Sequence, residues 1–185
     1  MRRVAITGIG IISSIGNNAD EVAASLKAGR SGITKAEKHI ELGFRSQVAG
    51  QPSFDIDANI DKRNRRFMGD GAAWNFAAME QAIADADLET DDISNPMTGL
   101  IMGSGGPSTK ALITAADTAR NASPKRVGPF AVPKCMSSTN SATLATPFQI
   151  KGINYSISSA CATSNHCIGN AAEMIQWGKQ DVMFA

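Results

Sequence analysis

Residues 152–168 decide the fold, and they read Gly152-Ile-Asn-Tyr-Ser-Ile-Ser-Ser-Ala-Cys161-Ala-Thr-Ser-Asn-His-Cys-Ile168. From residue 153 to 157 every second position is apolar, which is the periodicity of a strand with one buried face. Beyond Cys161, apolar residues recur at helical spacing up to Ile175, and Gly178 is a typical helix stop signal. The stretch therefore predicts a strand, a short turn that carries Cys161, and then a helix.

The same alternation extends over the rest of the chain. Short apolar runs predict further strands at residues 4–7, 46–49, 99–102 and 182–185. Capping residues and apolar stripes predict helices at residues 19–28, 70–86 and 137–149. Strands that alternate with helices are typical of an α/β layered fold with parallel strands, and 185 residues suit a single domain.

The composition excludes several classes of protein. The net charge is only +1, whereas nucleic-acid-binding domains usually carry a strong basic excess, so we expect no nucleic-acid partner. No apolar stretch approaches the ~18 residues that cross a bilayer, so we expect no membrane association. The 3 cysteines and 2 histidines lack disulfide and zinc spacing, and the glycine-rich segments lack phosphate-loop and dinucleotide patterns. We therefore expect free thiols in a reducing cytoplasm, with no metal and no cofactor.

Cys161 is the candidate nucleophile. At the start of a helix its sulfur would face unpaired backbone N–H groups and the positive end of the helix macrodipole, which both favour thiolate over thiol. The small neighbouring residues leave room for a substrate carbonyl, and the N–H of Cys161 could point at a developing oxyanion. A free cysteine among small residues is also a common packing residue. The residues alone leave both interpretations open.

The stretch 152–168 is similar throughout to the active-site signature of the β-ketoacyl-acyl-carrier-protein synthases. Residues 4–10, 14–18, 103–106 and 127–130 also resemble segments of this family, so the similarity covers the whole chain. Among the subtypes, the chain most resembles the type I elongating synthase of bacterial fatty-acid synthesis, and the type II elongating enzyme is the second choice.

The resemblance implies a thiolase-like fold, which has αβαβα layers and two similar halves in the complete protein, and a homodimer. It implies that Cys161 takes an acyl group from acyl carrier protein and holds it as a thioester. Malonyl carrier protein then loses carbon dioxide, and its enolate carbon attacks the acyl group. A 3-oxoacyl carrier protein, two carbons longer, leaves the enzyme.

The resemblance also implies that residues 1–185 are the amino-terminal half of such an enzyme. In this family the catalytic histidines, a conserved lysine and the second oxyanion donor come from the carboxyl-terminal half. We therefore expect that residues 1–185 alone do not complete the catalytic cycle. Two alternatives are another cysteine acyltransferase of the thiolase superfamily and a non-catalytic dimerisation subunit, although a scaffold has no need of the complete Cys161 motif.

Further site residues follow from the resemblance. Gly105 and Gly106 are expected to line the acyl pocket, and Met136 is expected to reach across the dimer towards the partner's acyl chain. Carrier-protein docking is expected at four basic residues, namely Lys62, Arg63, Arg66 and Lys125. Charge alone does not single these residues out, because most charge runs are solvated faces.

The remaining cysteines and histidines are expected to have structural or no roles. Cys135 and Cys167 are interpreted as packing residues. His166 is predicted to be a structural histidine, hydrogen-bonded within the core, because buried polar groups normally find partners. His39 lies in a polar stretch and is expected to be exposed.

Overall fold

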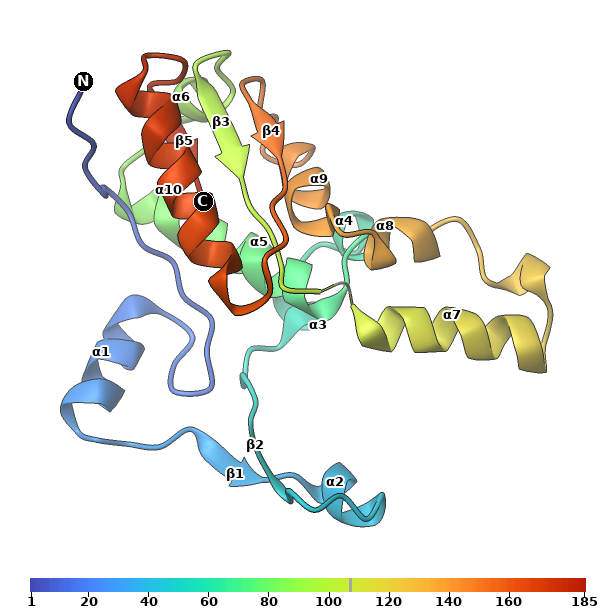
Figure 1. The fold of residues 1–185 in the computed structure, drawn as a ribbon. Coiled ribbons are helices and arrows are strands. Elements are labelled where there is room, and N and C mark those ends of the chain that lie inside the picture. Colours follow the sequence, from blue (N-terminus) through green and yellow to red (C-terminus); the bar gives the residue numbers. More distant parts are fainter. Residues whose placement is uncertain (107) are drawn as a thin grey trace.

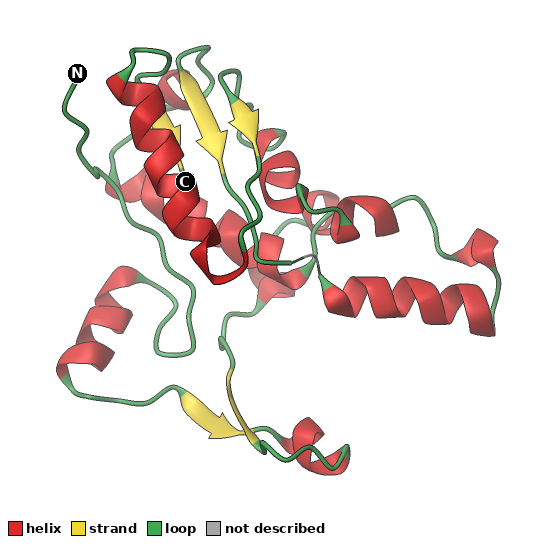
Figure 2. Ribbon diagram, viewed as in Figure 1, coloured by secondary structure: helices red, strands yellow, loops and turns green. Residues whose placement is uncertain are grey.

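The computed structural model describes residues 1–106 and 108–185, and its main body has three layers (Figure 1). A parallel three-stranded sheet, in the order β4-β3-β5, forms the middle layer. Helix α10 covers one face of this sheet, and helices α5 and α9 cover the other (Figure 2). The predicted α/β layered fold with parallel strands is confirmed.

The strands are β1 (Ile33–Lys35), β2 (Val48–Gly50), β3 (Thr98–Ile101), β4 (Asn154–Tyr155) and β5 (Val182–Phe184). The first helices are α1 (Ala19–Lys27), α2 (Glu37–Glu41), α3 (Ile56–Asn59), α4 (Lys62–Arg65), α5 (Asp70–Asp85) and α6 (Thr90–Ile93). The later ones are α7 (Thr109–Asn121), α8 (Ala131–Cys135), α9 (Thr139–Ala145) and α10 (Thr163–Gln176), with 3-10 helices η1 (Pro124–Arg126) and η2 (Ala160–Ala162).

Successive residues of the central strand β3 point to opposite faces of the sheet. Leu100 belongs to the cluster that faces α5 and α9, whereas Ile101 packs with Cys167 and Ala171 of α10. Because helices cover both faces, every residue of β3 is buried. This explains why the strand is a short apolar run in the sequence and does not alternate between apolar and polar residues.

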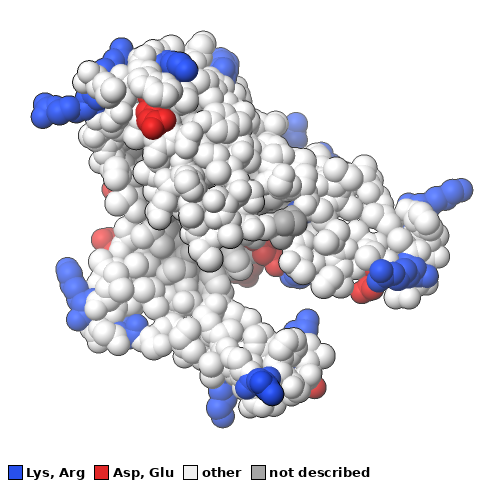
Figure 3. All heavy atoms as spheres, viewed as in Figure 1, with Lys and Arg blue, Asp and Glu red and all other residues white. Residues whose placement is uncertain are grey.

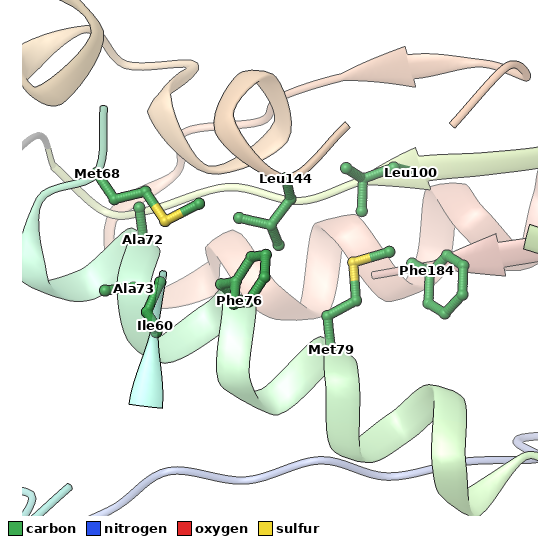
Figure 4. Close-up of a cluster of buried hydrophobic side chains, with 9 residues drawn as sticks. All are labelled: Ile60, Met68, Ala72, Ala73, Phe76, Met79, Leu100, Leu144 and Phe184. Carbon is green, nitrogen blue, oxygen red and sulfur yellow. The ribbon is translucent and has the colours of Figure 1, made fainter. Parts of the chain in front are cut away.

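The larger apolar cluster joins α5 to the sheet (Figure 4). Phe76 and Met79 project from α5 towards Leu144 of α9, Leu100 of β3 and Phe184 of β5. These five side chains are at most 8% exposed. The helix predicted at residues 70–86 from its apolar stripe is therefore confirmed as α5, and the stripe faces the core as expected.

Most of the other predicted elements are also confirmed. The helix predicted at residues 19–28 is α1, and the side chain of its cap residue Asn18 accepts a hydrogen bond from the N–H of Glu21 at 2.9 Å. The predicted strands at 46–49, 99–102, 153–157 and 182–185 correspond to β2, β3, β4 and β5. The helix predicted at 137–149 is shorter in the structure, where α9 ends two residues before Pro147.

The strand predicted at residues 4–7 is wrong, because this segment lies outside the sheet (Figure 2). The chain that follows it is held by side chains of α5. The N–H of Ile9 donates to Asp85 at 2.9 Å, and the N–H of Ile11 donates to Gln81 at 3.0 Å. An apolar run can indicate extended chain, but it does not specify which group accepts the backbone hydrogen bonds.

Helix α7 has no counterpart among the predicted elements. Its signals are modest: Ser108 caps it by accepting a hydrogen bond from the N–H of Ala111 at 3.3 Å, and alanines recur at helical spacing. None of its residues is buried, because α7 and α8 form an arm that projects from the layered body (Figure 1). The sequence therefore lacks the strong apolar stripe of a core helix.

An antiparallel hairpin also projects from the body (Figure 1). In this hairpin Ile33 pairs with Gly50 and Lys35 pairs with Val48, and α2 lies at its far end. The exposed fractions of Ile33 and Val48 are 56% and 51%. The hairpin is thus an accessory unit, separate from the three-layered core.

The close contact of the amino-terminal segment with α5 can be tested by substitution. A Cβ atom at Gly10 would lie 1.7 Å from the carbonyl oxygen of Ala78, so Gly10→Ala must displace the segment from the helix. We expect a loss of about 1–3 kcal/mol in unfolding free energy, measured by urea denaturation. In the control Gly71→Ala the new Cβ meets no described atom within 4 Å and should gain up to about 1 kcal/mol of helix propensity. A Gly10→Ala protein as stable as the parent would contradict the contact.

Candidate active site

Cys161 lies where the loops that follow β3 and β4 meet. The two strands are parallel, with Leu100 opposite Asn154 and Ile101 opposite Tyr155, so both loops leave the same edge of the sheet. Their backbones touch at Gly103, where a Cβ atom would lie 1.9 Å from the carbonyl oxygen of Ile157. The carboxyl edge of a parallel sheet is a common position for active sites in α/β proteins.

The residue before Cys161 has an unusual backbone conformation. Ala160 has φ of 46°, in the left-handed region that residues with a Cβ atom avoid. Asp87 and Gln149 share this feature, but each follows a helix and precedes an N–H that bonds back to that helix. Ala160 instead begins the 3-10 helix η2, which leads into α10. A left-handed non-glycine residue costs on the order of 1–3 kcal/mol, and such strain gathers at functional sites.

Cys161 itself is exposed and lies in η2, directly before α10. Its N–H donates to no other group in the described part of the chain, so it is free to bind an oxyanion. The first turn of α10 adds the positive end of a 14-residue helix next to the sulfur. The predicted strand–turn–helix around Cys161 is therefore confirmed, and the arrangement resembles a nucleophile elbow that bears a thiol.

Cys167 has the opposite environment. Its side chain is 1% exposed and packs with Ile101 beneath the elbow. Burial raises the pKa of the Cys167 thiol, although hydrogen bonds from the backbone at Ile157 and Gly103 act in the opposite direction. The interpretation of Cys167 as a packing residue is confirmed. Cys135, in α8, has intermediate exposure.

Buried polar side chains of α9 hold the loop after β3. Asn140 is 3% exposed and donates through Nδ2 to the carbonyl oxygen of Gly103 at 2.8 Å. The hydroxyl oxygens of Ser141 and Ser156 are 2.6 Å apart, and Ser156 donates to the carbonyl oxygen of Met102 at 2.7 Å. The sequence motifs do not single out these residues, and only the unusual density of polar residues within the helix predicted at 137–149 signals them.

The predicted pocket residues occupy different places. Gly105 faces the elbow, because a Cβ atom there would lie 3.0 Å from the carbonyl oxygen of Ala160. A Cβ atom at Gly106 would meet no described atom within 4 Å. Met136 is the cap residue directly after α8, and it is partly buried. The structure therefore brings Gly105 together with the elbow, but it gives Gly106 no such contact.

The basic residues predicted to dock the carrier protein are all exposed. Lys62 and Arg63 belong to α4, and Arg66 follows it, with its guanidinium 4.9 Å from the ring centre of Phe67 and 5.3 Å from that of Phe130. Lys125 lies in η1, after α7, and basic side chains are visible at the tip of this arm (Figure 3). The front face of the body over α10 carries few charges (Figure 3).

Arg65 differs from its basic neighbours because it turns inward. Its Nη2 atom lies 2.6 Å from Oδ1 of Asp70, and Nζ of Lys110 lies 2.9 Å from Oδ2 of the same carboxylate. Burial by itself raises the pKa of Asp70, but the hydrogen bonds and charges of Lys110 and Arg65 outweigh burial and hold that pKa below its ordinary value. This network attaches α4 to the starts of α5 and α7.

The prediction that His166 is a core residue is wrong. His166 is exposed on α10, outside its buried face of Thr163, Cys167 and Ala171, and its carbonyl oxygen accepts a hydrogen bond from Asn170. The five-residue offset from Cys161 indicates a different helix face, but not whether that face is covered. His39, predicted to be exposed, is half-buried instead: its ring packs against that of Phe44, with 5.1 Å between the ring centres, and its Nδ1 atom lies 3.2 Å from the carbonyl oxygen of Ser46 in the hairpin.

The described residues show neither a metal-binding cluster nor a membrane-spanning helix. They contain no group of three or more His, Cys, Asp or Glu side chains placed to hold a metal ion. Within the same part of the chain, no helix has the length and apolar character needed to cross a membrane.

The contrast between the thiols leads to a labelling prediction. A small haloacetamide at pH 8 should alkylate Cys161 first, because Cys161 is exposed whereas Cys167 is buried and its pKa is raised. Cys167 should react only after denaturation, and Cys135 provides an internal reference of intermediate exposure. Peptide mass spectrometry over time measures all three rates. Equal rates at Cys161 and Cys167 in the folded protein would contradict the described elbow.

Comparison with known proteins agrees with this geometry. The family model "Beta-ketoacyl synthase, N-terminal domain" matches residues 1–185. The 3-oxoacyl-[acyl-carrier-protein] synthase 1 of Haemophilus influenzae is 54% identical over 186 residues, which are 100% of this chain and 46% of that protein. The synthase 1 of Escherichia coli strain K12 is 54% identical over 187 residues, with the same coverage. The chain thus spans about half the length of these curated relatives.

Two further comparisons concern subtype and fold. The 3-oxoacyl-[acyl-carrier-protein] synthase 2 of Vibrio cholerae is 33% identical over 185 residues, 100% of this chain and 45% of that protein. The crystal structure of a β-ketoacyl synthase from Burkholderia phymatum STM815 matches with a TM-score of 0.84 at 31% identity, over 97% of this chain and 45% of that one. The expected thiolase-like fold is confirmed, and the chain belongs to the β-ketoacyl synthase family, whose amino-terminal domain it forms.

Proposed function

We propose that residues 1–185 form the amino-terminal half of a type I 3-oxoacyl-[acyl-carrier-protein] synthase, in which Cys161 accepts the growing acyl chain. The observation that carries this proposal is the exposed thiol of Cys161, which lies on a strained turn at the start of α10. The higher identity to synthase 1 than to synthase 2 supports the type I assignment.

The first half-reaction uses groups that this chain supplies. The thiolate of Cys161 attacks the carbonyl carbon of the acyl thioester, and a new carbon–sulfur bond forms. The carbonyl oxygen becomes an oxyanion, which the free N–H of Cys161 stabilises as one donor. The carbon–sulfur bond to the carrier then breaks, and the carrier leaves as a thiolate that takes up a proton. Gly105, beside Ala160, and Gly106 line the path of the acyl chain.

The second half-reaction needs groups from outside these residues. Decarboxylation of malonyl carrier protein places negative charge on an enolate oxygen, which requires positioned hydrogen-bond donors. Among the described residues, neither histidine makes a hydrogen bond to Cys161: His39 lies in the hairpin near Ser46, and His166 is an exposed residue of α10. We infer that residues 1–185 alone transfer an acyl group weakly and do not condense it.

Acyl carrier protein is the inferred partner. A carrier with acidic residues would meet the exposed cations of α4 and η1, and charge complementarity of this kind speeds encounter and orients docking. The aromatic contacts of Arg66 fix one of these cations in place, so less side-chain freedom is lost on docking. Lys62, Arg63, Arg66 and Lys125 are the proposed contacts.

A homodimer is the inferred assembly, and the cytoplasm is the inferred location. The arm formed by α7 and α8 exposes Leu112, Ile113 and Val132, which are 52%, 54% and 70% exposed. Apolar surface of this extent is typical of a protein interface. Met136 directly follows α8, at the base of the same arm, which is consistent with its proposed place beside the partner's acyl chain. The three cysteines are free, as expected in a reducing compartment.

The role of Cys161 is tested in the complete protein, which joins residues 1–185 to a carboxyl-terminal half. Incubation with acyl carrier protein should add one acyl group, detected as a mass increase of the intact protein. Cys161→Ala should abolish this adduct, because no other thiol lies on the elbow. The matched control Cys135→Ala should keep it. An adduct at the parent level in Cys161→Ala would refute the proposed function.

Carrier docking is tested by removing charge without removing bulk. The double variant Lys62→Gln/Arg63→Gln should raise KM for acyl carrier protein by about three- to tenfold and weaken its dependence on salt, while kcat stays unchanged. Lys38→Gln, in α2 of the separate hairpin, serves as the control and should have no effect. An unchanged KM with unchanged salt dependence in the double variant would exclude this surface.

A further inference from the structure

We propose that Thr163 is a positioning residue for the acyl-transfer step, and that it aims the N–H of Cys161 at the oxyanion. This inference rests on the proposed function of Cys161. Thr163 is the first residue of α10 and is 3% exposed, so its hydroxyl does not face solvent. The cap position before it is occupied by Ala162, whose side chain makes no capping hydrogen bond.

The Thr163 hydroxyl bonds to both sides of the strained residue. Its Oγ1 atom accepts a hydrogen bond from the N–H of Ser159 at 2.9 Å and donates to the carbonyl oxygen of Ala160 at 2.8 Å. The backbone N–H of Thr163 donates to the same carbonyl oxygen. The Thr163 side chain therefore holds the backbone on both sides of the φ angle of Ala160, which is 46°: the N–H of Ser159 before it and the carbonyl of Ala160 after it.

These contacts reach the oxyanion donor through a planar peptide group. The carbonyl of Ala160 and the N–H of Cys161 belong to the same peptide unit, and in a trans peptide they point in opposite directions. Fixing the direction of the carbonyl oxygen therefore fixes the direction of the N–H of Cys161. The hydrogen bonds to the carbonyl also polarise the peptide, which makes its N–H a better donor.

The methyl group of Thr163 has a separate role. A Cβ atom at Gly103 would lie 2.8 Å from Cγ2 of Thr163, so this methyl group packs where the loops after β3 and β4 cross. The branched side chain is also stiff about χ1, which keeps the hydroxyl in place. Valine has the shape of threonine without its hydrogen bonds, and serine keeps the hydroxyl without the methyl group. The two variants separate these contributions.

The deciding measurement is single-turnover acylation of Cys161 in the complete protein, over a range of acyl-carrier concentrations. Thr163→Val should lower the maximal acylation rate at least tenfold, with the half-saturating carrier concentration unchanged, because only the oxyanion contact is misdirected. Thr163→Ser should stay within about threefold of the parent rate, because the hydroxyl bonds remain. Thr143→Val is the matched control, since Thr143 is also buried and donates to a helix carbonyl at 2.6 Å, away from the elbow.

Alkylation of the same thiol separates positioning from a general loss of structure. Haloacetamide attack develops no oxyanion, so Thr163→Val should alkylate at Cys161 within about threefold of the parent rate. Parent-like acylation in Thr163→Val overturns the inference. An equal loss of acylation and alkylation, or a Thr163→Ser variant as slow as Thr163→Val, overturns it as well. If the valine variant does not fold, Thr163→Ala takes its place under the same criteria.

The outcomes also distinguish this inference from the function on which it rests. If Cys161→Ala still forms the acyl adduct, the proposed function fails. If Cys161→Ala blocks the adduct while Thr163→Val acylates normally, the nucleophile stands and only the positioning role of Thr163 is excluded.

Discussion

The direct backbone contact between Gly103 and Ile157 is the constraint on which the rest of the site depends. No side chain fits between these two residues, so the loops that follow β3 and β4 cross at van der Waals distance. This crossing brings Gly105 against Ala160, and it leaves space beneath the elbow for the small buried thiol of Cys167. Polar side chains of α9 then fix the loop after β3 from behind. The conformation of Ala160 is thus enforced by packing on several sides, which is how a folded protein maintains local strain.

The sequence predicts the core of this arrangement because short-range patterns determine it. Strand periodicity before Cys161, helical spacing after it and the apolar run of β3 each describe an element that is covered by its neighbours. The amino-terminal segment was mispredicted for a different reason. Its apolar run at residues 4–7 is real, but the chain that follows bonds through Ile9 and Ile11 to Asp85 and Gln81 of α5 and not to a strand, and no local pattern encodes a partner more than 60 residues away.

Some residues of the candidate site are predictable from the sequence, whereas others are recognised only in the structure. Cys161 is found by its motif, whereas Asn140 bonds to Gly103, 37 residues away, a contact that only the folded chain brings together. The hydroxyl bonds of Thr163 span only three and four residues, but they depend on the left-handed turn at Ala160, which the sequence pattern does not reveal. The exposure of His166 was not predictable, because helical spacing gives the face on which a residue lies but not whether other elements cover that face. The basic run at residues 62–66 also needs the structure, since charge alone does not distinguish the inward-facing Arg65 from its exposed neighbours.

The separation of the amino-terminal segment from the sheet has a consequence for local unfolding. Residues 4–7 are outside the strand ladder, so their amide protons can exchange with solvent while the β4-β3-β5 sheet stays closed. The N–H of Arg2 reaches the carbonyl oxygen of Gln176 at the last turn of α10, whereas Cys161 lies before the first turn, about 20 Å away along a 14-residue helix. We therefore expect detachment of this end of the chain to leave the elbow intact.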